Sequence, residues 1–74
     1  MTINDLTLGQ SAVITAVGGE GALRRRLLDM GLTPKTRVQV YKMAPLGDPM
    51  ELHLRGYALT LRKEDAAKLT VMER

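Results

Sequence analysis

The sequence predicts a small, mainly β fold: a closed or nearly closed barrel of five strands, with one helix inserted after the first strand and a short helical turn before the last. The chain has 74 residues, which suits one domain over residues 1–74. Apolar residues alternate in five short segments that turn residues separate, and only one segment has helical spacing. Short strands joined by tight turns favour a barrel, because closure removes exposed strand edges.

The first strand and the helix come early in the chain. Residues 11–17 form the expected strand, and a helix is expected over residues 20–30. Leu23, Leu27 and Met30 fall on one side of this helix, since they are spaced i, i+4 and i+7. On the opposite side, Arg25 and Asp29 are expected to form a solvated charge pair. Gly31 and Pro34 then end the helix.

The remaining elements are short strands and turns. Alternating apolar residues predict the other four strands, and acidic residues at the start of residues 63–67 predict one helical turn. A tight hairpin is expected at Gly56 and Tyr57. The expected strands cover residues 36–43, 50–55, 58–62 and 69–72.

Composition excludes several classes of protein. The chain has no cysteine, so neither a disulfide framework nor a thiolate metal site can form. The net charge is only +3, and tyrosines are the only aromatic residues, so we expect no nucleic-acid partner. We find neither a signal peptide nor an apolar run of transmembrane length, and we expect a cytoplasmic protein that does not itself span a membrane.

Two segments are candidates for binding a macromolecular partner. In the helix, Arg24, Arg25 and Leu28 lie outside the main apolar stripe, and Leu27 is either part of the same patch or simply core. The second candidate is the rigid loop formed by Pro45, Leu46, Gly47, Asp48 and Pro49. Rigid loops lose little entropy on binding, although this loop is also needed as a turn in which Asp48 binds backbone N–H groups. The arginine run is either a solvated face or an arginine finger for a nucleotide site.

His53 is the only histidine, and we expect it to be an outward strand residue. A metal site needs several convergent ligands, so we predict neither a metal site nor a cofactor. A weak hard-ligand site formed by Asp48, Glu51 and His53 stays open as an alternative. Since the sequence has no nucleophile–base set and no phosphate-binding glycine motif, we do not expect an enzyme.

Three blocks in fixed order resemble the FeoA family of small SH3-like domains. The blocks are APLGDP over residues 44–49, RLLDMGL over residues 26–32 and LRKEDA over residues 61–66. The resemblance covers residues 6–71 and implies an SH3-like barrel. One position departs from it: the family usually has glycine where this sequence has Lys35, which suggests either a type I turn or a mildly strained backbone.

The resemblance implies a non-enzymatic accessory role in bacterial ferrous iron transport. The expected partner is FeoB, a membrane transporter with a cytosolic G domain, which would recruit the chain to the inner face of the membrane. Two alternatives stay open: a metal-responsive module like the SH3-like domain of iron-dependent repressors, and a GTPase-activating partner of the FeoB G domain. A homo-oligomer formed through strand edges also stays open.

Overall fold

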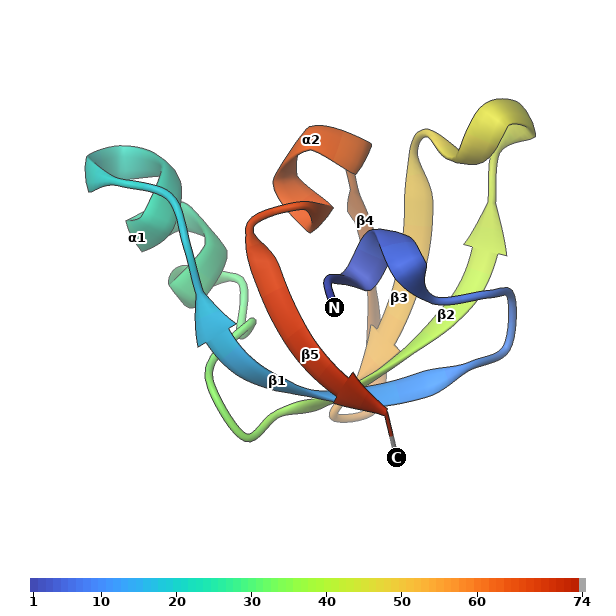
Figure 1. Ribbon diagram of the computed structural model, residues 1–74, viewed down its shortest axis with the longest axis horizontal. Helices are drawn as coiled ribbons and strands as arrows, with labels where there is room; N and C mark the ends of the chain where they lie inside the picture. The colour runs from blue at the N-terminus through green and yellow to red at the C-terminus, as the bar shows by residue number, and fades with distance from the viewer. Residues whose placement is uncertain (74) are drawn as a thin grey trace.

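The computed structural model of the chain describes residues 1–73 and is mainly β (Figure 1). One short 3₁₀ helix, η1, precedes the first strand, and a second 3₁₀ helix, η2, and two α-helices lie between strands. In chain order the elements are η1 (Ile3–Asp5), β1 (Ser11–Val17), α1 (Gly21–Asp29), β2 (Arg37–Met43), η2 (Pro45–Gly47), β3 (Met50–Leu54), β4 (Tyr57–Leu61), α2 (Lys63–Ala66) and β5 (Leu69–Glu73). The five predicted strands, the helix and the helical turn are therefore all present.

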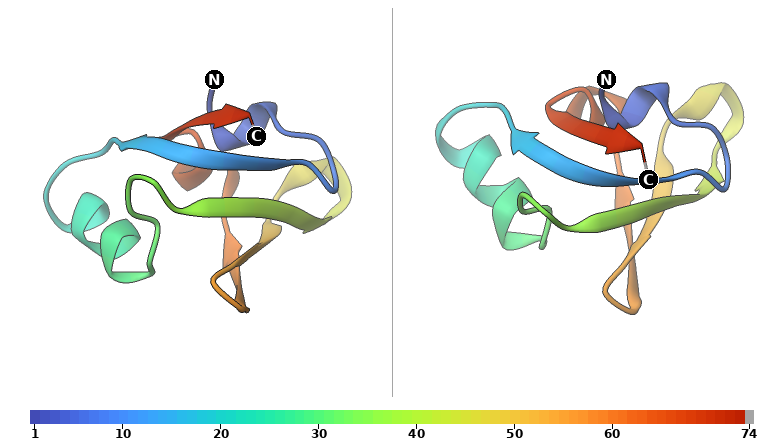
Figure 2. Two further views of the ribbon diagram at one scale, coloured as in Figure 1. Left: turned by 90° about the horizontal axis from the view of Figure 1, so that it is seen from below. Right: turned by 60° about the horizontal axis from the view of Figure 1, so that its bottom comes forward.

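The strands form one antiparallel sheet in the order β4-β3-β2-β1-β5, which curls around the core (Figure 2). The sheet is not strictly closed, because its two end strands, β4 and β5, do not pair with each other. Residues before η1 cover part of the outer edge of β5, where Thr2 bridges Thr70 and Val71 N–H donates to Met1 O at 2.9 Å. The mainly β, SH3-like prediction is confirmed, with an open rather than a closed sheet.

The core is built from aliphatic side chains and methionine, as the lack of Phe and Trp requires. Alternate residues of each central strand point inward, so the predicted period-two pattern decides which side chains are buried. The buried hydrophobic side chains are Ile3, Leu6, Ala12, Ile14, Val17, Leu27, Leu32, Val38, Val40, Met50, Leu52, Leu54, Leu61, Ala66, Leu69 and Val71.

Gly31 ends α1 as predicted. Its φ is +96°, a left-handed conformation that favours glycine, and Leu32 N–H donates back to Leu27 O at 3.2 Å. A side chain at this position would also collide with the Tyr57 hydroxyl, which donates to Met30 O at 2.6 Å. Gly31 therefore lets β4 approach the end of α1.

The structure defines the type of one turn that the sequence left open and shifts a second turn by one residue. Lys35 has a φ of +77°, and Thr36 N–H donates to Thr33 O at 3.1 Å, so the turn is of type II with a strained third residue. The hairpin prediction is shifted by one residue, because Leu54 pairs with Tyr57. The two turn residues are thus Arg55 and Gly56, both with positive φ, as in a type I′ turn.

None of the helices within residues 1–73 has the length and apolar character needed to cross a bilayer.

Candidate partner-binding face

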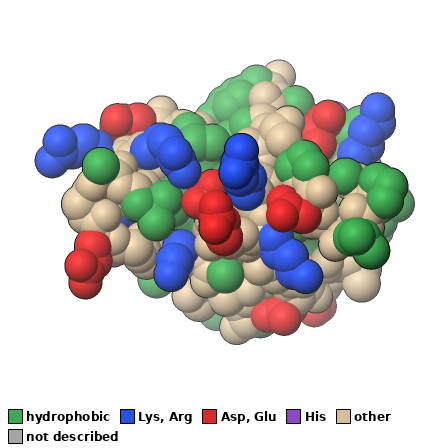
Figure 3. Space-filling view, turned by 90° about the horizontal axis from the view of Figure 1, so that it is seen from above, with side chains coloured by type: hydrophobic (Ala, Val, Ile, Leu, Met, Phe, Trp, Pro, Cys, Tyr) green, Lys and Arg blue, Asp and Glu red, His purple; other side chains and the backbone are tan. Residues whose placement is uncertain are grey.

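The two predicted binding segments lie on one side of the molecule but do not adjoin. Helix α1 and the loop of residues 44–49 lie at opposite ends in Figure 1, and α2 lies between them. We call α1, α2 and residues 44–49 together the helix–loop face. Seen from above in Figure 3, charged side chains of both signs gather in the middle of the molecule, and apolar side chains gather at the end that carries η2. A partner that contacts both predicted segments must therefore also cross α2.

The three arginines of α1 have different environments. Arg24 Nε donates to Val17 O at 3.3 Å, which ties the helix to the end of β1. Arg26 Nη2 lies 3.2 Å from Asp65 Oδ2 in an ion pair that joins α1 to α2. The expected Arg25–Asp29 pair does not form within residues 1–73, where the ion pair of this helix is the one between Arg26 and Asp65. Arg25 is exposed and keeps an unpaired charge within those residues.

Leu27 and Leu28 are buried to different extents. Leu27 is 0% exposed, so its side chain belongs to the core and lies out of reach of a partner. Leu28 is half-buried and packs against the core from the side of the helix. Of the two leucines, only Leu28 keeps any surface that a partner can contact.

The loop of residues 44–49 holds Leu46 out in solvent. Leu46 is 96% exposed and has a φ of +71°, which a leucine adopts only at a cost in energy. Two backbone hydrogen bonds brace the loop, from Gly47 N–H to Ala44 O at 2.8 Å and from Ala44 N–H to Pro49 O at 2.9 Å. The loop is thus closed on itself by backbone hydrogen bonds and presents one apolar side chain.

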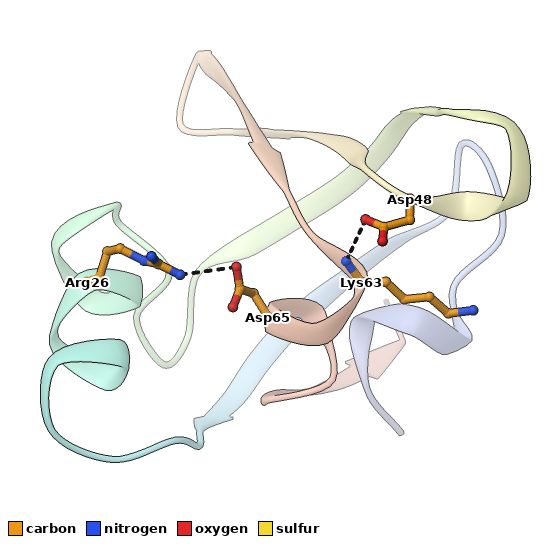
Figure 4. Close-up of polar contacts among 4 residues, drawn as sticks. All are labelled: Arg26, Asp48, Lys63 and Asp65. Atoms are coloured by element: carbon orange, nitrogen blue, oxygen red, sulfur yellow. Dashed lines mark hydrogen bonds and ion pairs between the residues drawn. The ribbon is translucent and has the colours of Figure 1, made fainter.

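Helix α2 is predicted from the sequence as a helical turn, but the sequence does not place it on the binding face. The Lys63 N–H donates to Asp48 Oδ1 at 3.1 Å, so the loop caps α2, and Asp65 binds Arg26 from the other side (Figure 4). The predicted bonding of Asp48 to a backbone N–H is confirmed. Neither the Asp48–Lys63 nor the Arg26–Asp65 contact follows from sequence spacing, because each joins residues far apart in the chain.

A cleft of about 510 Å³ runs between α1, β4 and α2. Its walls carry charges of both signs together with apolar groups, and they hold the Arg26–Asp65 pair. The cleft is lined by Arg26, Met30, Thr60, Leu61, Arg62, Glu64 and Asp65.

His53 lies on the outer face of the sheet, as expected. Its Nε2 is 3.0 Å from Glu51 Oε2, and its ring stacks on Tyr41 with centroids 3.9 Å apart. Asp48 is not part of this cluster, since its carboxylate binds the start of α2. Within residues 1–73 no three His, Cys, Asp or Glu side chains are grouped as metal ligands would be.

A family model described as the FeoA domain matches residues 1–73. A curated relative from Porphyromonas gingivalis (strain ATCC BAA-308 / W83), the Fe(2+) transport protein A/Fe(2+) transporter FeoB fusion protein, is 41% identical over 71 residues. That match covers 96% of this chain but only 8% of the fusion protein, so the chain spans a small part of its curated relative.

Solved structures agree with this match. The FeoA protein of Chlorobium tepidum is 41% identical, with a TM-score of 0.89 over 99% of this chain and 70% of its own. The iron(II) transport protein A of Clostridium thermocellum is 32% identical, with a TM-score of 0.93 over 99% of this chain and 45% of its own. FeoA of Stenotrophomonas maltophilia, an SH3 domain protein solved with zinc, is 28% identical, with a TM-score of 0.85 over 97% of this chain and 89% of its own. The chain therefore belongs to the FeoA family, whose SH3-like domains are associated with ferrous iron transport.

Proposed function

We propose that this chain is an accessory protein of ferrous iron uptake that binds a FeoB-type transporter on the cytoplasmic side and has no catalytic activity of its own. The fusion protein of Porphyromonas gingivalis supports this partner, because it joins a sequence 41% identical to this chain to a FeoB transporter. Two domains that are joined in one polypeptide have a high effective concentration relative to each other. Binding between separate chains supplies the same proximity when the two are not fused.

The observation that carries the proposal is the exposure of Leu46. An apolar side chain that is 96% exposed gains nothing from burial within this chain, yet its left-handed backbone costs about 1–2 kcal/mol. Backbone strain of this kind is characteristic of ligand clamps and switch regions. A braced loop also loses little entropy when it binds. Leu46 thus suits the role of an apolar anchor that a pocket on the transporter covers.

The α1 end of the helix–loop face supplies the second contact. Arg24 and Arg25 are exposed, and Arg25 carries an unpaired charge within residues 1–73. A positive group at the rim of an interface favours an acidic surface on the partner and raises the rate of association. We infer that Leu46, with Pro45 and Pro49 beside it, contributes most of the binding affinity. The two arginines, Arg24 and Arg25, orient the chain on its partner.

The test is capture of the detergent-solubilised FeoB-type transporter by the immobilised chain. We expect Leu46→Asn to weaken binding at least tenfold without loss of folding stability, because asparagine tolerates a positive φ better than leucine. Leu8→Asn is the matched control: Leu8 is also an exposed leucine, at 65%, but lies in the loop between η1 and β1. If Leu46→Asn keeps its affinity within twofold, or if Leu8→Asn loses as much, the loop is not the anchor.

A second candidate function, stimulation of GTP hydrolysis by the FeoB G domain, rests on Arg25. Arg24 and Arg26 are already engaged in contacts within the chain, whereas Arg25 is free to reach into a nucleotide site. An arginine finger typically contributes 10³–10⁵-fold to the hydrolysis rate. The measurement is GTP turnover by the transporter with saturating chain, in which Arg25→Ala should remove any stimulation. If the unmodified chain leaves turnover unchanged, this candidate is rejected.

A further inference from the structure

The outer face of the sheet carries a basic groove that the proposed function does not use. We define the groove by Ser11, Arg37, Gln39, His53, Arg55 and Gly56, which line a hollow of about 410 Å³. Strand register brings three of these side chains together, because Ser11 pairs with Gln39, and Gln39 pairs with His53. The β3–β4 hairpin, which supplies Arg55 and Gly56 to the groove, lies on the opposite side of the molecule from α2 and η2 (Figure 1).

Arg55 is held in the groove by neutral groups. Its Nη2 donates to Thr36 Oγ1 at 2.7 Å and to Thr33 Oγ1 at 3.1 Å, and the two hydroxyls lie 2.8 Å apart in a hydrogen bond of their own. Thr36 is only 4% exposed, so this support is fixed by the fold. Hydroxyls orient the guanidinium without neutralising its charge, and Nε and Nη1 keep donors for another group. Arg55 is thus preorganised to bind an anion.

The charge of the groove is not balanced from within residues 1–73. Neither Arg37 nor Arg55 forms an ion pair there. The nearby carboxylate of Glu51 is already bound to His53 Nε2 at 3.0 Å. Guanidinium groups bind carboxylates through two parallel hydrogen bonds, so two such groups in one hollow suit a ligand with more than one carboxylate.

An apolar hollow continues the groove on the same face. Val13 pairs in register with Arg37 on one side and with Met72 on the other. Val13, Pro34 and Met72 line this second hollow, which has a volume of about 320 Å³, and Met72 is 57% exposed. A free phosphate or a lipid headgroup has nothing to place against these side chains, whereas a peptide with mixed acidic and apolar residues contacts both hollows.

We propose that this groove binds an acidic, partly apolar peptide segment of a partner protein, with Arg37 and Arg55 contacting its carboxylates. The proposal goes beyond the contact with the transporter, because it gives the chain a second binding surface on its opposite side.

The test uses the isotope-labelled full chain and a capped hexapeptide that alternates glutamate and leucine. We expect saturable shifts of the backbone amide signals at Ser11, Arg37 and Gln39, with binding that weakens as salt rises. The double variant Arg37→Gln, Arg55→Asn should bind at least tenfold more weakly. Asparagine suits the positive φ of 48° at position 55, so the hairpin turn is retained. Should the double variant unfold, Arg37→Gln alone, which keeps the hydrogen bonds of Arg55 to Thr33 and Thr36, should still weaken binding severalfold.

Lys68→Gln is the charge-matched control for the single variant Arg37→Gln, since it removes one exposed positive charge outside the groove and should change the affinity less than twofold. The proposal is overturned if the peptide gives no saturable shift, if the groove variants bind as well as the unmodified chain, or if a hexapeptide of glutamine and leucine binds equally well. Tighter binding of inorganic phosphate or of phosphatidylglycerol vesicles at the same residues also overturns it. Leu46→Asn should leave peptide binding unchanged, so failure of the groove and failure of the transporter contact are distinguishable.

Discussion

Lys35 shows how one residue can cost stability without touching the core. Its side chain is exposed, yet its backbone has a φ of +77° at the third position of the Thr33–Thr36 turn. The left-handed conformation costs a residue with a Cβ about 1–2 kcal/mol. Glycine avoids that cost but loses about 0.5–1 kcal/mol because its unfolded chain is more flexible. The balance favours glycine at this position.

We therefore predict that Lys35→Gly raises the free energy of unfolding by about 0.5–1 kcal/mol, measured by urea denaturation. Lys35→Ala is the control, because it removes the same charged side chain but keeps the Cβ and hence the strain. Alanine should give no gain. An equal gain from both variants would show that the lysine side chain, and not the backbone, is responsible.

At the scale of elements, α2 depends on a distant cap. Its N-cap residue, Arg62, makes no side-chain capping bond, and Asp48 supplies the acceptor from the neighbouring loop. We expect Asp48→Ala to lower the free energy of unfolding by about 1 kcal/mol, as for the loss of an N-cap side chain. Asp48→Asn keeps a carbonyl oxygen at the same place and should lose less than half as much. Hydrogen exchange of the Lys63 amide should rise in the alanine variant, and unchanged exchange would contradict the capping role.

The sequence predicts the strands and helices of this chain well, because each of them depends on a pattern of residues that are close together in the chain. Period-two alternation identifies the strands, and Gly31 fixes the end of α1 through its own backbone. What local patterns omit is contact across the fold. Arg26 meets Asp65 and Asp48 meets Lys63 only after the sheet curls and brings α1, α2 and the loop together. The predicted hairpin turn lies one residue too far along the chain for a related reason. Arg55 has an unfavourable positive φ in this turn, and its hydrogen bonds to Thr33 and Thr36, which are distant in the sequence, stabilise that conformation.

At the scale of the whole molecule, a core of aliphatic side chains and methionine in so small a chain leaves little reserve of stability. A domain of this size buries only about 60% of the surface of its unfolded chain, which places its stability near the low end of the range for proteins, about 5 kcal/mol. Every fully buried leucine then matters to the fold. Leu27 is the residue through which α1 enters this core, since it is 0% exposed while the other leucines of the helix, Leu23 and Leu28, are half-buried.

Leu27→Ala should therefore cost about 2–5 kcal/mol, and a loss at the upper end of that range leaves a substantial fraction of the chain unfolded at room temperature. Leu28→Ala, on the next residue and only half-buried, should cost about 1 kcal/mol because it loses roughly half of a full burial term. Thermal and urea unfolding curves of the two variants measure this difference directly. Equal losses would mean that α1 is anchored along its flank and not by a single inward leucine, and Leu28 would then have no surface free for a partner.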